Sequence, residues 1–254
     1  MVFDSILTRR KAKLSPGDLV EIDGRPVRLK VHASARRVSL RLDSAKREIV
    51  ATAPNLRRLP DALAFAQSRA GWIAERLDAL PEPQGFAPGQ VISVAGAPCR
   101  LERPAMRIPP KIIPARDDEP ARLLAYGGDQ ATFGRAVVRA LKAEALGLLK
   151  ARTAAHAAAL GAAPPSVAVM DAKARWGSCT PAHAGKGASI RYVWRLILAP
   201  PFVLDYVAAH ECAHLVEANH GPRFWALVRR LYGDHAAARA WLKAHGARLH
   251  GMGG

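Results

Sequence analysis

The segment His210-Glu211-Cys212-Ala213-His214 carries the residue types in this chain that are best suited to do chemistry. Residues four apart on an α-helix share one face, so the imidazoles of His210 and His214 would lie one turn apart and could bind one metal ion. Glu211 would lie beside that ion, where its carboxylate can accept a proton from a water molecule that the ion activates. The pattern therefore predicts a catalytic zinc site.

A third histidine, His220, follows six residues after His214. On a continued helix its side chain would point about 240° away from that of His214, so the chain must turn for both to reach one ion. Ala218-Asn219 offers such a turn, because Asn tolerates the left-handed conformation that ends helices, and Gly221-Pro222 follows. Metzincins place a third histidine at this spacing with a glycine at the turn, but Glu217 stands at that glycine position here.

Three histidines within eleven residues, in a chain that has nine in all, favour metal binding. The alternative is an ordinary helix that merely carries these residues, because such motifs arise readily in an Arg- and Ala-rich chain. Three histidine ligands would leave a fourth position open for water, which is typical of a catalytic zinc site. We therefore expect one Zn²⁺ per chain, although imidazole ligands also accept other first-row metals.

The residues around the motif predict the elements that must position it. Pro200 and Pro201 favour the start of a helix, and the apolar residues that follow indicate that this helix is buried. A long helix is predicted over residues 131–160, where Ala, Leu and Lys dominate and Gly161 follows. The other predicted elements are strands at residues 167–170 and 189–198 and helices at residues 223–232 and 234–245.

The first half of the chain is rich in predicted strands. Alternating apolar residues on both sides of Asp23-Gly24 predict a hairpin. Similar patterns predict strands at residues 38–42, 49–53 and 111–113, a hairpin at residues 91–102 and one helix at residues 60–80. We therefore predict an α+β fold with an N-terminal β-rich region over residues 1–120 and a catalytic region over residues 121–254.

The composition narrows the class of protein. The chain has 254 residues and a net charge of +17, which is spread along the whole sequence. Such a basic surface favours association with nucleic acid; an Arg-rich genome that makes an evenly basic surface is the alternative. Three cysteines, no apolar run long enough to span a bilayer and no apolar signal core in residues 1–14 lead us to expect a cytoplasmic protein with no membrane partner.

Five motifs occur in an order and spacing that resemble the YgjP-like (DUF45) metallopeptidase family, which is related to the SprT-like and other zincin peptidases. They are Arg175-Trp176-Gly177-Ser178-Cys179, Trp194-Arg195-Leu196, Asp205-Tyr206-Val207, His210-Glu211-x-x-His214-Leu215 and Asn219-His220-x-x-x-Phe224-Trp225. The resemblance implies a zincin-like α+β core, with a long support helix, a small sheet and an active helix. It also implies His210, His214 and His220 as metal ligands and Glu211 as the general base. Val193 departs from the family, which usually has Asn before the Trp.

The motif and the resemblance together predict a zinc-dependent metallopeptidase that acts on a protein or peptide substrate. A tetrahedral oxyanion would need a donor besides zinc, and the candidates are Arg195, Arg223, Tyr206 and Tyr232. Arg175 would shape the substrate edge and Asp205 would orient a ligand histidine, although each of these residues has a purely structural alternative. The alternative functions are a zinc hydrolase of another amide or ester, and a basic nucleic-acid-binding module whose metal site is not catalytic.

Overall fold

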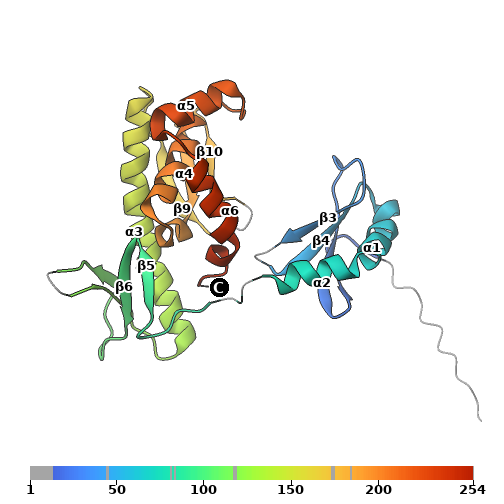
Figure 1. The fold of residues 1–254 in the computed structure, drawn as a ribbon, viewed down its shortest axis with the longest axis horizontal. Coiled ribbons are helices and arrows are strands. Elements are labelled where there is room, and N and C mark those ends of the chain that lie inside the picture. The colour runs from blue at the N-terminus through green and yellow to red at the C-terminus, as the bar shows by residue number, and fades with distance from the viewer. Residues whose placement is uncertain are drawn as a thin grey trace, which may run out of the picture. The chain divides into compact units, whose positions relative to one another are not determined.

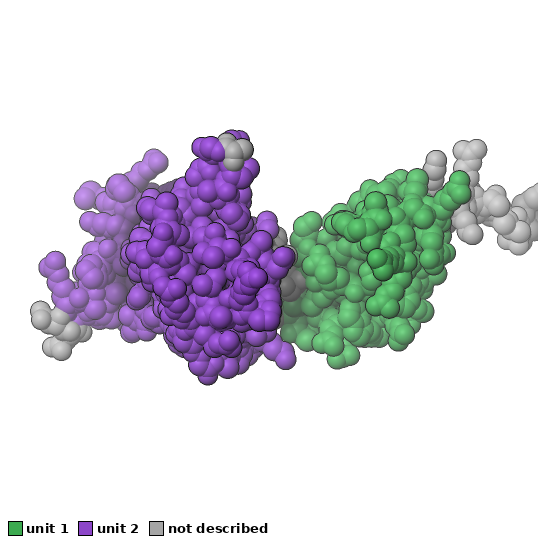
Figure 2. All heavy atoms as spheres, turned by 90° about the horizontal axis from the view of Figure 1, so that it is seen from above, with its two compact units in different colours: residues 1–80 green, residues 81–254 purple. Residues whose placement is uncertain are grey.

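The computed structural model describes residues 14–43, 46–80, 82, 84–116, 119–172, 175–183 and 185–253. The chain divides into two compact units, residues 1–80 and residues 81–254, which Figures 1 and 2 distinguish. Both units combine helices with small sheets, so the predicted α+β class is confirmed. No helix among the described residues is long and apolar enough to cross a membrane.

Unit 1 is a four-stranded sheet covered by two helices. Its strands are β1 (Leu19–Ile22), β2 (Arg25–Val31), β3 (Ser39–Asp43) and β4 (Glu48–Ala53), in the order β1-β2-β4-β3. Asp23 and Gly24 both have positive φ, of 48° and 72°, which is the conformation that an Asp-Gly hairpin turn requires. The short helix η1 (Leu56–Arg58) then leads into α1 (Leu59–Gln67) and α2 (Ala70–Asp78).

Two helices therefore occupy the segment for which the sequence predicted one helix over residues 60–80. The Ser68 hydroxyl donates a hydrogen bond of 2.8 Å to the carbonyl of Phe65, and such a side-chain bond to the backbone competes with helix continuation. Arg69 then has φ −117° and ψ 22°, outside the helical region, and α2 begins at the next residue.

Unit 2 contains two sheets. The first joins β5 (Val91–Val94), β6 (Ala97–Glu102), β7 (Lys111–Ile113) and β8 (Ala121–Leu124), in the order β5-β6-β8-β7. The second joins β9 (Ser166–Met170), β10 (Gly177–Thr180) and β11 (Ser189–Val193), in the order β10-β11-β9. Because β6 pairs with β8 across residue 120, residues 81–120 pack with the second unit, and the division at residue 80 differs from the predicted boundary at residue 120.

The helices of unit 2 pack against the three-stranded sheet or against one another. They are α3 (Gln130–Ala159), η2 (Trp194–Leu198), α4 (Pro201–Ala213), α5 (Pro222–Tyr232) and α6 (Ala236–His250). Figure 1 shows α3 as the long helix beside α4 and β9. The strand predicted over residues 189–198 ends at Val193, and the helical residues after it, η2, are all buried. A continuous apolar run does not by itself distinguish a buried strand from a buried helical turn.

Polar contacts fix α4 and η2 within this core. The buried His156 of α3 pairs through Nε2 with the Asp205 carboxylate of α4 at 2.9 Å. Arg195 of η2 is 5% exposed, donates to the carbonyl of Met252 at 2.7 Å and forms an ion pair with Asp171. A buried guanidinium is stable only when such partners satisfy it, so Asp171 and the C-terminal segment together hold Arg195.

We expect Asp171→Ala to lower the free energy of unfolding by about 1–3 kcal/mol, because it leaves the Arg195 guanidinium buried without its carboxylate. The matched control is Glu119→Ala, which removes a carboxylate that is 74% exposed from its ion pair with Arg122 and should cost less than about 1 kcal/mol. Urea-induced unfolding of both variants measures the difference. Equal losses in the two variants would show that Arg195 does not depend on Asp171.

Candidate active site

Helix α4 carries His210 and Glu211 near its C-terminal end, and the chain turns directly after it. The amide of Leu215 donates to the carbonyl of Cys212 at 2.9 Å, and the amide of Val216 donates to the carbonyl of Ala213 at 3.1 Å. These short-range bonds close a tight turn, after which the chain returns and α5 begins at Pro222. The prediction that the chain turns between His214 and His220 is confirmed.

The form of this turn differs from the expectation. Asn219 does not have a positive φ, and Gly221 has a φ of −80°, so neither residue adopts the left-handed conformation that would end the helix. The bonds from residue i to residue i+3 end the helix instead, as they do in many last helical turns. The turn follows α4 directly, at residues 214–216, so it lies before Ala218-Asn219 and lacks the left-handed conformation expected there.

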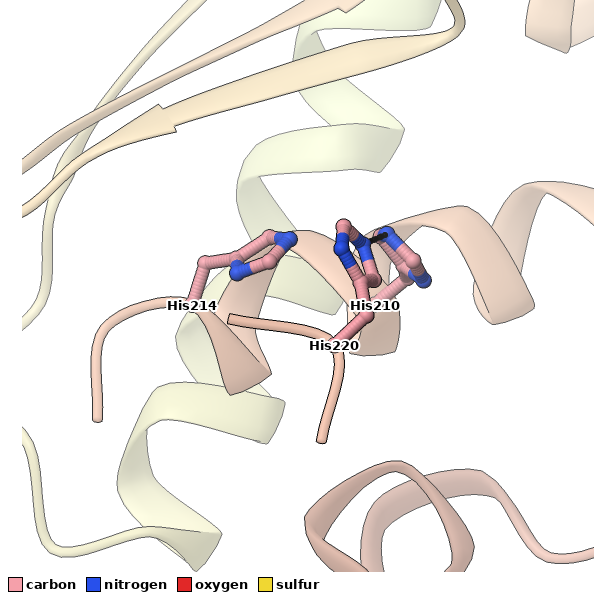
Figure 3. Close-up of side chains that lie close together, drawn as sticks. All are labelled: His210, His214 and His220. Atoms are coloured by element: carbon pink, nitrogen blue, oxygen red, sulfur yellow. Dashed lines mark hydrogen bonds between the residues drawn. The ribbon is translucent and has the colours of Figure 1, made fainter. Parts of the chain in front are cut away.

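The three histidines converge on one point. One ring nitrogen from each of His210, His214 and His220 lies within 4.8 Å of the other two, and the Nε2 atoms of His210 and His220 are 3.1 Å apart. Figure 3 shows a ring nitrogen of His214 directed toward the other two rings. Two nitrogen ligands of one tetrahedral zinc ion lie about 3.3 Å apart, given zinc–nitrogen bonds of about 2.05 Å. The spacing of these rings therefore suits a single metal ion.

The protonation states of the rings also suit a metal. Nδ1 of His214 lies 2.9 Å from the carbonyl of Glu217, which only accepts hydrogen bonds, so Nδ1 carries the proton and Nε2 of the neutral ring keeps its lone pair. Burial lowers the pKa of His210 to about 4, and the neighbouring His214 and His220 add to this effect. Neutral imidazoles are the form that binds metals.

Glu211 is 6% exposed and lies in the wall of a cavity of about 650 Å³, which the three histidines also line. Burial raises the pKa of this carboxyl group to about 7, and the positive charge of Arg175 opposes the rise. Among the described residues that line the cavity, Glu211 is the one acidic group. A single buried carboxylate beside three imidazoles can exchange protons with a molecule bound in the cavity.

Gly177, the first residue of β10, makes this position of Glu211 possible. A Cβ atom on Gly177 would lie 2.5 Å from both Cγ and Oε1 of Glu211, closer than real side-chain contacts allow. The strand and the helix can approach this closely only because residue 177 has no side chain. The sequence had suggested a substrate-edge role for Arg175, and it did not identify Gly177 as the contact with Glu211.

Two further residues expected from the sequence, Arg175 and Tyr206, line the same cavity. Tyr206 is 5% exposed, and its ring meets the ring of His210 edge-on, with 5.9 Å between the ring centres. The ring of His235 stacks with the ring of Tyr206 and also with that of Trp225. These contacts pack α4 against α5 and the start of α6.

The other candidates lie outside the cavity. Asp205 pairs with His156 of α3, which is a contact between helices and not a contact with one of the three converging histidines. Arg195 is held by Asp171 and the C-terminal segment, and neither it nor Tyr232 lines the cavity. The side chain of Arg223 is 88% exposed and lies 3.5 Å from the Glu217 carboxylate.

Sequence reasoning gave no role in the site to Arg239 and Leu242, which α6 contributes to the cavity, or to Trp225, whose ring stacks on that of His235. The guanidinium of Arg239 lies 5.3 Å from the centre of the Trp225 ring, a cation–π arrangement. Arg239 and Leu242 are three residues apart, so their side chains lie on the same face of α6. No local pattern in the sequence indicates that this face packs against α4.

A family profile described as "YgjP-like, metallopeptidase domain" matches residues 36–245. This match covers most of the chain and confirms the resemblance drawn from the sequence motifs. The description of the family implies a metal cofactor, and the histidine cluster lies within the matched residues. No curated protein and no solved structure matched the chain.

We expect Gly177→Ala to lower the free energy of unfolding by about 1–3 kcal/mol, because the added methyl group overlaps the Glu211 side chain. Gly187→Ala is the matched control, since a Cβ atom there meets nothing within 4 Å. The double variant Gly177→Ala/Glu211→Ala should recover most of the loss, because the overlapping atoms are gone. Thermal unfolding of the two single variants and the double variant measures this recovery. If the losses of stability in Gly177→Ala and Glu211→Ala simply add in the double variant, residues 177 and 211 are not in contact.

The stability of the protein should depend on pH through His250, whose ring stacks on Trp176 with 4.1 Å between the ring centres. Burial, and secondarily Arg195, lowers the pKa of His250 from 6.5 to about 4. As the pH falls, His250 of the unfolded chain is therefore protonated at a higher pH than His250 of the folded protein. The contribution of neutral His250 to stability is complete above about pH 6.5 and is lost as the pH falls toward 4.

The variant His250→Gln removes this titration, so its melting temperature should fall less than that of the wild type between about pH 7.5 and about pH 5. Other groups, among them His210, titrate in both proteins, and only the difference between the two falls reports on His250. Identical falls would mean that His250 is protonated as easily in the folded protein as in the unfolded chain.

Proposed function

The chain belongs to the YgjP-like metallopeptidase-domain family, and from this membership we propose that it is a zinc-dependent peptidase. The observation that carries the proposal is the convergence of His210, His214 and His220 within 4.8 Å, beside Glu211 in one cavity. We further propose that α3, the sheet β9–β11 and α4 serve as the support helix, small sheet and active helix of a zincin-like core.

The residues present fit a zinc ion. His210, His214 and His220 offer three imidazoles, of which two have pKa values lowered by burial, and imidazole is a preferred zinc ligand. When bound, zinc would polarise the scissile carbonyl and make water a stronger nucleophile.

Glu211 is the residue we propose as the general base and general acid. Its carboxylate takes a proton from the attacking water, the new carbon–oxygen bond forms, and the same proton goes to the amine that leaves as the carbon–nitrogen bond breaks. Proton transfer of this kind contributes about 10²–10⁴-fold to the rate. The close approach of Gly177 supports the role, because it holds the carboxylate in the cavity wall beside His210.

Tyr206 is the residue we propose as a donor to the oxyanion. Of the four donors expected from the sequence, Arg195, Arg223 and Tyr232 are not among the residues that line the cavity, and Tyr206 is. It precedes His210 by one helical turn, so its ring lies on the same side of α4 as the histidines. A phenol hydroxyl at such a position can stabilise a developing negative charge.

Metal analysis of the purified protein, combined with three variants, tests this function. We expect about one zinc per chain in the wild type, loss of the metal in His214→Ala and full retention in the control His32→Ala, whose histidine is exposed in unit 1. Glu211→Gln should keep the metal and the fold but lose about 10²-fold or more of the hydrolysis of a peptide pool. Hydrolysis that persists in Glu211→Gln would refute the mechanism, and zinc that persists in His214→Ala would refute the site.

A further inference from the structure

Two arginines, Arg175 and Arg239, line the cavity of the proposed active site. Arg175 precedes β10, and Arg239 lies on α6, so the two guanidiniums come from different walls. Both residues are exposed, and neither forms an ion pair with any of the described residues. Arg175 and Arg239 are the two arginines that line this cavity, and neither is neutralised there by a carboxylate of the described residues.

Arg239 lies on the side of the histidines. Its guanidinium lies 5.3 Å from the centre of the Trp225 ring, and that ring lies 6.0 Å from the rings of both His210 and His220. A cation held over an aromatic face keeps the edge of its planar group free to donate hydrogen bonds. Trp225 thus orients Arg239 at the rim of the site.

Arg175 lies on the side of the carboxylate. It precedes Gly177 by two residues, and Gly177 is the residue against which Glu211 packs. The Glu211 carboxylate is buried and faces this wall, but it does not form an ion pair with Arg175. The guanidinium of Arg175 therefore retains its capacity to bind a second, external anion.

We propose that Arg175 and Arg239 make this site selective for substrates with a carboxylate close to the scissile bond. Guanidinium groups bind carboxylates through two parallel hydrogen bonds, a geometry that an ammonium group cannot offer. The carboxylate comes from one of two sources: an Asp or Glu side chain next to the bond, or the free C-terminus of the substrate. This inference rests on the proposed peptidase function and adds its substrate class.

Binding to zinc-loaded Glu211→Gln protein tests the inference without turnover. The probes are fluorescent pools of pentapeptides with random flanking residues and blocked ends, one with a central Asp and one with a central Asn, and a third pool of neutral peptides with a free C-terminus. The glutamine at position 211 is a neutral amide. A substitution of Arg175 in this protein therefore changes the binding of the peptide alone and does not also change the ionisation of Glu211. We expect the Asp pool, the free C-terminal pool or both to bind about tenfold more tightly than the Asn pool.

Arg239→Gln and Arg175→Gln, each in the Glu211→Gln protein, should remove most of this roughly tenfold preference, and Arg239→Glu should reverse it toward a pool with a central Lys. The matched control is Arg248→Gln, which removes one positive charge from an exposed part of the same helix that does not line this cavity. The Asp and free C-terminal pools identify which source of carboxylate the site takes. Equal affinity for all pools, or no binding of any, would overturn the inference.

The same proteins separate this inference from the peptidase function. A wild-type enzyme that cleaves neutral peptides as fast as acidic ones retains the peptidase function and loses the selectivity. A protein that cleaves no peptide but binds acidic pools through Arg175 and Arg239 retains the carboxylate site and loses the peptidase function. The two failures therefore give different results.

Discussion

The candidate site depends on how closely strand β10 approaches helix α4. At the closest point Gly177 leaves no space for a side chain, because a Cβ atom would lie 2.5 Å from Oε1 of Glu211. Gly177 pairs with Tyr192 of β11, and the Tyr192 hydroxyl shares a buried hydrogen bond of 2.9 Å with Thr153 of α3. The position of one carboxylate is thus fixed by contacts that run from α4 through the sheet to α3.

This arrangement places polar groups where burial opposes their charge. The pKa of Glu211 rises to about 7 and that of His210 falls to about 4, and in both cases burial is the first cause. Each shift disfavours the charged form, so the site costs free energy that packing elsewhere in the unit must offset. The largely buried α4 and the long α3 beside it supply that packing. The site is polar within a rigid, apolar support, which keeps its groups in place before any ligand arrives.

Local patterns in the sequence predicted the parts of the site that depend on a few neighbouring residues. The spacing of His210 and His214 follows from helix geometry, and the need for a turn before His220 follows from the same geometry. Contacts between elements far apart in the chain had no such signal. Asp205 looks like a residue that orients a ligand histidine, but α3 brings His156 within 2.9 Å of it. Arg239 enters the cavity only because α6 packs against α4, which no short pattern encodes.

The charges that line the cavity would connect metal binding with substrate selection in the proposed site. Arg175 and Arg239 contribute two positive charges and an ionised Glu211 one negative charge, so the lining carries a net charge of +1, and a divalent ion would raise it to +3. Guanidiniums near a cation site repel the ion, so their presence lowers the affinity for metal unless an anion joins them. A substrate carboxylate removes this repulsion and is itself attracted by the combined field. Metal and acidic substrate would therefore each strengthen the binding of the other, which is the reciprocal coupling that linkage requires.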